Sequence, residues 1–147
     1  QPLSQAVKKA VLETSKDMLN PPTRNFGIKG IRQLADDILN WPESLDSKQL
    51  RLTLFLTYID MEEAGTGGGN FRRLYSRFLK EASELISDKC LRRAWKKLDS
   101  SANAWSEIAR LLLKASQVEN AEEIISKADK KIIECADIEE EAFSSII

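Results

Sequence analysis

The residues best suited to chemistry gather in one stretch, Glu62 to Arg73, which reads EEAGTGGGNFRR and holds four of the six glycines. Glycine permits sharp backbone turns and close approach of another group to the main chain. A helix that starts after the glycines adds free amide N–H groups and the positive end of its dipole, a combination that can hold an anion such as phosphate. The candidate substrate-binding residues are Gly65, Thr66, Gly67, Gly68, Gly69, Asn70, Arg72 and Arg73.

A plain connection between two helices is the alternative interpretation of the same glycines. The stretch lacks the Lys-Ser or Lys-Thr ending of a phosphate-binding P-loop, and no strand precedes it. The strand–turn–helix context of a dinucleotide fingerprint is missing for the same reason. Glu62 and Glu63 fall at the negative end of the preceding helix, so we expect Arg72 or Arg73 to pair with them.

Catalytic residue types are scarce. The chain has no histidine, which excludes Ser-His-Asp and Cys-His catalysis within it and most zinc sites. Its two cysteines, Cys90 and Cys135, form neither a metal knuckle nor a CxxC pair, and we interpret them as buried free thiols. Adjacent carboxylates such as Asp36 and Asp37 point about 100° apart on a helix and do not converge. We therefore predict no catalytic residue, no metal site and no cofactor in this chain.

Size and charge narrow the class of protein. The 147 residues predict a single domain, residues 1–147, with enough length to bury a core. Balanced charge, with 22 basic and 23 acidic residues, argues against a nucleic-acid or membrane-surface partner. No signal peptide and no apolar run of about 20 residues is present, and we expect a cytoplasmic protein. Because the chain starts at Gln1 without methionine, we expect it to be the C-terminal part of a longer protein.

Apolar residues recur at helical spacing along most of the chain. Pro21 and Pro42 are expected to end the first two helices, and Ser47, Asn70 and Asp88 to cap later ones. A lone strand at 52–59 is rejected because its backbone would have no partner. The predicted fold is an all-α antiparallel bundle of about six helices, with the glycine stretch as the joint between the third and fourth. The expected helices span 3–19, 28–40, 47–64, 71–86, 88–115 and 119–144.

Two finer expectations concern burial. The third helix has a wide apolar stripe, which predicts a central and largely buried helix. The acidic run Glu139-Glu140-Glu141 is expected on a solvated face, unless packing of Ala142 beside it splits the run.

Several segments resemble a known family. The string from Ile59 to Arg72, IDMEEAGTGGGNFR, is supported by FGIKGIRQLADD at 26–37, by Trp41, by Phe78-Leu79 and by AWSEIA at 104–109. Together they resemble the C-terminal helical region of the butirosin biosynthesis protein H-like family, over nearly the whole chain. The AGTGGGNFR string is the most specific part of the resemblance.

The resemblance implies a role in acyl transfer. In that family an N-terminal domain similar to a cysteine peptidase precedes the helical region, and the named member moves an aminoacyl chain from an acyl carrier protein to an aminoglycoside amine. The implied partners are that N-terminal domain, which would hold the nucleophile, and the carrier, whose phosphopantetheine arm would lie at the glycine joint. Two alternatives stay open: an interaction domain that binds a partner or forms a homodimer, and a domain that is itself an enzyme.

Overall fold

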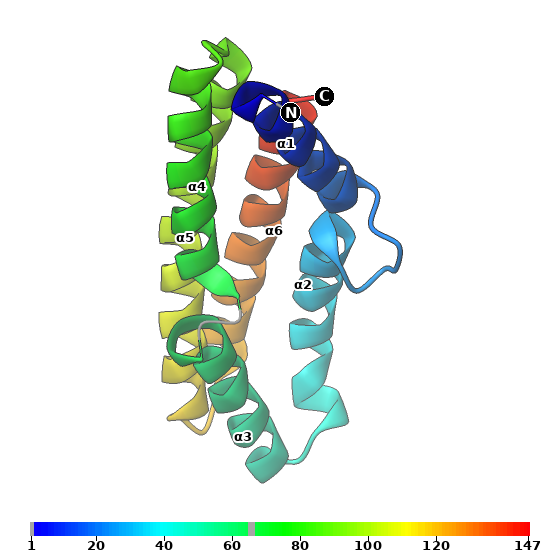
Figure 1. Cartoon of the computed structure of the whole chain (residues 1–147). Coiled ribbons are helices and arrows are strands. Elements are labelled where there is room, and N and C mark those ends of the chain that lie inside the picture. Colours follow the sequence, from blue (N-terminus) through cyan, green and yellow to red (C-terminus); the bar gives the residue numbers. More distant parts are fainter. Residues whose placement is uncertain (1, 65–66) are drawn as a thin grey trace.

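Helices make up most of the computed structural model, which describes residues 2–64 and 67–147 (Figure 1). No strand occurs within those two ranges, and the all-α prediction is confirmed. The elements in chain order are α1 (Leu3–Leu19), α2 (Gly27–Ser44), α3 (Ser47–Tyr58), a π-helical turn η1 (Ile59–Glu63), α4 (Gly68–Leu85), α5 (Lys89–Ser116) and α6 (Glu122–Ser144).

The long helices α5 and α6 form the middle of the core. α5 packs against α3, α4 and α6, whereas α1 and α2 pack on α6 (Figure 1). The prediction of one long helix from Asp88 is confirmed, and the Asp88 carboxylate caps it by accepting from the amides of Cys90 and Leu91. The buried side chains of α5 recur every three or four residues, which is the spacing of one helix face. They include Leu91, Ala94, Leu98, Ala102, Trp105, Ile108, Ala109 and Leu112.

Pro42 lies inside α2, so the expectation that Trp41-Pro42 ends this helix is wrong. Proline has no amide hydrogen, and its place in the helix leaves one main-chain bond unmade. The helix still completes a further turn, because the amide of Leu45 donates to the carbonyl of Trp41 at 2.9 Å.

The start of α3 also differs from the prediction. Asp46, rather than Ser47, is the N-cap. Its carboxylate accepts from the amide of Gln49 at 2.9 Å, and its own amide donates to the side chain of Gln49 at 3.1 Å. This reciprocal capping box satisfies two donors at the helix start.

α3 is not the central buried helix that its apolar stripe suggested. Leu54 is its one fully buried side chain, because α3 packs mainly on α5 and only lightly on α2. A hydrophobic stripe wider than the neighbouring helix can cover leaves its edges in solvent. Those edges are Leu52, Phe55 and Leu56, which are 55%, 41% and 50% exposed.

Membrane-spanning character is absent from the helices of the described ranges, since none combines the length and the apolar composition that crossing a bilayer requires.

Candidate functional site

The glycine joint is preceded by a local change of helix type. After α3 the chain makes the π turn η1, in which the amide of Ala64 donates to the carbonyl of Ile59 at 2.8 Å. Such turns are frequent at functional sites. Two of the predicted site residues, Gly65 and Thr66, lie outside the described residues.

Gly68 and Gly69 allow close packing of backbones at the start of α4. Gly68 has a φ of +63°, and a Cβ there would stand 2.6 Å from the carbonyl oxygen of Met61. A Cβ on Gly69 would stand 2.6 Å from the carbonyl oxygen of Ala102 in α5. Both contacts are too short for any other residue, so these two glycines seat α4 against η1 and α5.

Gly67 differs from its two neighbours because it is open. It is the N-cap residue of α4, and a Cβ at this position would meet no atom of the other described residues within 4 Å. The prediction that Asn70 caps this helix is wrong, since Asn70 lies inside its first turn. The Asn70 side chain instead accepts a long hydrogen bond, 3.4 Å, from Arg73, whose guanidinium also donates to Ser106 at 2.8 Å.

Arg72 reaches into the core and pairs with Glu139 of α6. Its Nε donates to Oε1 at 2.8 Å and its Nη2 to Oε2 at 3.2 Å, so the contact is bidentate. Two α5 side chains complete the set: the Ser101 hydroxyl donates to Oε1 at 2.6 Å and the Trp105 indole at 3.0 Å. The guanidinium carbon lies 4.9 Å from the centre of the Trp105 ring, a cation–π distance. The Glu139 side chain is 0% exposed.

The acidic run is split, which is the alternative expected with Ala142 packed beside it: Ala142 and Glu139 are buried, and only the other two glutamates face solvent. Glu140 and Glu141 do so, and they pair with Arg32 and Lys97 at 2.6 and 2.9 Å. Glu139 falls four residues after the buried Cys135, which places it on the inner face of α6. Helical register therefore predicts an inward-facing Glu139, whereas the usual preference of charged side chains for water predicts an exposed one.

The expected pairing of Glu62 or Glu63 with an arginine is wrong. Arg72 pairs with Glu139, and Arg73 donates to Asn70 and Ser106. Glu63 accepts from the Tyr58 hydroxyl at 2.8 Å. One carboxylate oxygen of Glu62 is buried and has no hydrogen-bond partner among residues 2–64 and 67–147.

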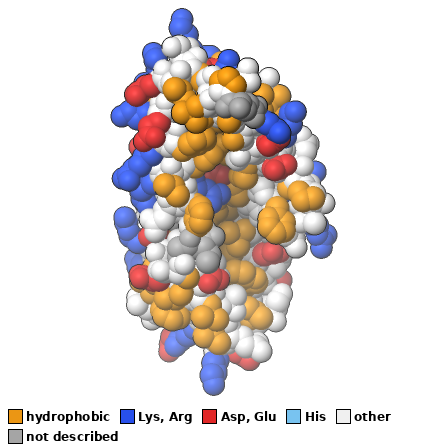
Figure 2. All heavy atoms as spheres, viewed as in Figure 1, with side chains coloured by type: hydrophobic (Ala, Val, Ile, Leu, Met, Phe, Trp, Pro, Cys, Tyr) orange, Lys and Arg blue, Asp and Glu red, His pale blue; other side chains and the backbone are white. Residues whose placement is uncertain are grey.

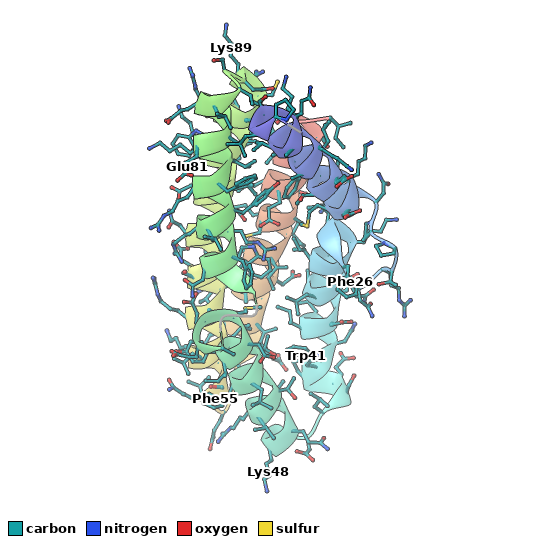
Figure 3. All side chains as sticks on the ribbon, in the orientation of Figure 1. Phe26, Trp41, Lys48, Phe55, Glu81 and Lys89 are labelled. Atoms are coloured by element: carbon teal, nitrogen blue, oxygen red, sulfur yellow. The ribbon has the colours of Figure 1, made fainter. Side chains whose placement is uncertain are left out.

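A pocket of about 270 Å³ lies between α1, α4, α5 and α6. Side chains from these helices converge on this part of the molecule (Figure 3). On the same side the surface is hollowed between α4 and α2, and hydrophobic side chains follow the hollow (Figure 2). The apolar walls of the pocket are Met18, Phe71, Leu98 and Phe143. Its polar lining is Thr14, Tyr75, Arg72 and Glu139, with Gly67 beside them.

The structure therefore separates the predicted site residues into groups. Gly67 and Arg72 line the pocket. Gly68 and Gly69 do not line it; they are buried and hold α4 against η1 and α5. Arg73 bonds to Ser106 of α5, which is not a lining residue. Sequence reasoning did not single out the other lining residues. Thr14, Met18, Leu98, Glu139 and Phe143 come from α1, α5 and α6 and share no motif, and Phe71 and Tyr75 of α4 fit its apolar helical spacing.

Tyr75 brings a hydroxyl to the pocket. Its oxygen is buried, and no hydrogen bond of standard geometry joins it to another described residue. Burial raises the pKa of Tyr75, and its neighbour Thr14 offsets part of that rise. The group is therefore a neutral phenol at physiological pH and keeps a proton to donate.

Neither cysteine is in a disulfide, as predicted, although only Cys135 is buried. Burial raises the pKa of Cys135 to about 12, so its sulfur stays a thiol and is a poor nucleophile at neutral pH. Cys90 is partly exposed, and Arg93 lies 3.8 Å from its sulfur. Across residues 2–64 and 67–147, no group of three or more Cys, Asp and Glu side chains is arranged to hold a metal ion.

The fold and the pocket define an all-α domain with a partly polar cavity at a glycine joint. Residues 1–146 match the family model described as domain of unknown function (DUF4872), and the chain belongs to that family. Comparison with curated proteins gave no match, and comparison with solved structures gave none either.

Proposed function

We propose that this chain is the accessory helical domain of a cytoplasmic acyltransferase similar to the butirosin biosynthesis protein H-like family. In this proposal the antiparallel bundle of about six helices is the frame, and the pocket face lies against an N-terminal domain similar to a cysteine peptidase. The observation that carries the proposal is that Gly67 and Arg72, both from the family-like string, line one pocket.

The domain supplies no nucleophile in this proposal. Two features support that division of labour: the chain has no histidine to act as a base, and the Cys135 thiol has a pKa of about 12. The acyl group then arrives on a carrier protein, and the nucleophile and base belong to the other domain.

The decisive experiment blocks the pocket without disturbing the backbone. Gly67→Leu places a side chain at the pocket, where a Cβ meets nothing within 4 Å. We expect the full-length protein with Gly67→Leu to lose about tenfold or more of its acyl transfer, since a misplaced substrate is costly to the rate. Transfer from an aminoacyl-loaded carrier protein to an aminoglycoside amine is measured by mass spectrometry.

Gly67→Ala is the matched control, and it should keep near-normal transfer because its methyl group is short. Thermal unfolding of both variants must resemble that of the wild type. Gly68 is unsuitable for this test, since any side chain there meets the carbonyl of Met61 and strains a positive φ. Normal transfer by a folded Gly67→Leu protein would refute the accessory role of this pocket.

A second candidate function is homodimerisation through α3. It is favoured by the three exposed apolar side chains Leu52, Phe55 and Leu56, which fall at i, i+3 and i+4 on one helix face. Sedimentation of the chain, with Phe55→Lys as the disrupting variant, tests it. A wild type that stays monomeric at high micromolar concentration rules it out.

A further inference from the structure

The Tyr75 hydroxyl lies beside the Thr14 side chain, but its oxygen makes no hydrogen bond of standard geometry with the described residues. The oxygen is buried, and leaving a buried donor unmatched among the described side chains costs about 1–3 kcal/mol. Buried polar groups without a hydrogen bond are rare in native proteins, so this one needs a physical reason. An acceptor atom on a bound molecule provides one, because the hydroxyl belongs to a residue that lines the pocket.

The ion pair in the same pocket excludes the most obvious acceptor, an anion. The positive charge of Arg72 is matched by Glu139 in a bidentate contact, and the carboxylate is completed by Ser101 and Trp105. A phosphate or carboxylate placed beside this pair would therefore add an uncompensated negative charge in a half-buried site, which is unfavourable. The charge state of the pocket favours a neutral molecule.

The walls indicate what the rest of that molecule is. Met18, Phe71, Leu98 and Phe143 are apolar, and Phe71 is 50% exposed, so it stands partly open to an entering group. A volume of about 270 Å³ is slightly below the range of drug-sized ligands, which fits a short chain better than a fused ring system.

We infer that this pocket binds a neutral carbonyl compound with a short apolar chain, and that Tyr75 donates its hydroxyl hydrogen to the carbonyl oxygen. The inference rests on the proposed function only for the source of the ligand, which would be the acyl group in transit. Binding itself is a property of this chain and is measured on it alone.

The test compares three probes on the 147-residue chain by amide NMR titration. Hexanamide carries a neutral carbonyl and a short chain, hexanoate has the same shape with a negative charge, and inorganic phosphate has the charge without the chain. We expect hexanamide to shift amides near Gly67 and Tyr75 and to bind about tenfold more tightly than hexanoate. Phosphate should leave those amides unmoved.

Tyr75→Phe removes the hydroxyl and keeps the ring. We expect it to weaken hexanamide binding about tenfold while the unfolding temperature of the free chain stays equal or rises, because an unmatched buried donor is gone. If the Tyr75 hydroxyl had only a structural role, Tyr75→Phe would not weaken hexanamide binding. Tyr58→Phe is the control: its hydroxyl bonds to Glu63 outside the pocket, and it should leave the affinity unchanged.

Two results overturn the inference: equal hexanamide affinity in Tyr75→Phe and wild type, or tighter binding of hexanoate or phosphate than of hexanamide. The test is separable from that of the proposed function. Hexanamide binding together with normal acyl transfer by Gly67→Leu would keep the pocket ligand and discard the accessory role. No hexanamide binding together with a loss of acyl transfer in Gly67→Leu would discard the pocket ligand and keep the accessory role.

Discussion

Two carboxylates on α6, ten residues apart, are buried in opposite ways. Glu139 is fully buried and accepts hydrogen bonds from Arg72, Ser101 and Trp105. Asp129 is 8% exposed, and its Oδ1 has no hydrogen-bond partner in the described part of the chain. Two acids on the same helix are thus both buried, but only Glu139 has hydrogen-bond donors for both of its carboxylate oxygens.

The neighbouring helices explain the difference. At Glu139, α4 and α5 supply a guanidinium, a hydroxyl and an indole. At Asp129, α2 supplies another acid, Asp36. The pKa of Asp129 is raised by burial first and by the negative charge of Asp36 second, with Lys130 offsetting part of the rise. Burial makes a charge costly, and the groups that face it decide whether that cost is offset or increased.

The largest effect is expected at the satisfied carboxylate. Glu139→Ala leaves the Arg72 charge and the Ser101 and Trp105 donors without their acceptor, and should lower the free energy of unfolding by about 3–5 kcal/mol. Urea denaturation measures it. The neighbouring variant Glu140→Ala breaks only the exposed pair with Arg32 and should cost less than about 1 kcal/mol. Equal losses in the two variants would contradict the contrast.

An intermediate effect is expected when only the charge is removed. Glu139→Gln keeps an acceptor for Ser101 and Trp105, but it leaves Arg72 without a counterion. We expect a loss of about 1–3 kcal/mol, smaller than that of Glu139→Ala, by the same urea measurement. A loss as large as in the alanine variant would mean that the charge pair, rather than the hydrogen bonds, accounts for the effect of this residue.

The smallest effect, of opposite sign, is expected at Asp129. A raised pKa means that the folded chain binds its proton more tightly, so stability falls as pH rises from the ordinary value of 3.8 through the raised one. Asp129→Asn removes this loss. Its melting temperature at pH 7 should exceed that of the wild type by about 1–3 °C, and the gain should vanish below pH 3.8. A gain that is the same at both pH values would show that it does not come from ionisation.

Periodicity predicted the helices well where it was long and unbroken. Helix α5 keeps one apolar face for 28 residues, and its cap at Asp88 follows the usual chemistry. Local rules failed where a tertiary contact decided the outcome. Pro42 is tolerated inside α2, and Glu139 is buried because three side chains from distant segments meet it.

The candidate site was predictable only in part. The glycines indicated close backbone approach, and Gly68 and Gly69 provide it. The pocket beside them could not be predicted, since Thr14, Met18 and Phe143 come together only through packing of α1 and α6 against α4. The spacing of residues along the chain does not predict which helices pack against one another.

The set of donors around Glu139 also bears on how the molecule opens. Its hydrogen bonds join residues 67, 38 and 34 positions apart, from three helices. Any one of those helices that detaches would leave a charge or a donor unmatched in the core. The start of α4, the middle of α5 and the end of α6 should therefore exchange their amide hydrogens as one cooperative unit, while α3, with a single buried side chain, can open on its own.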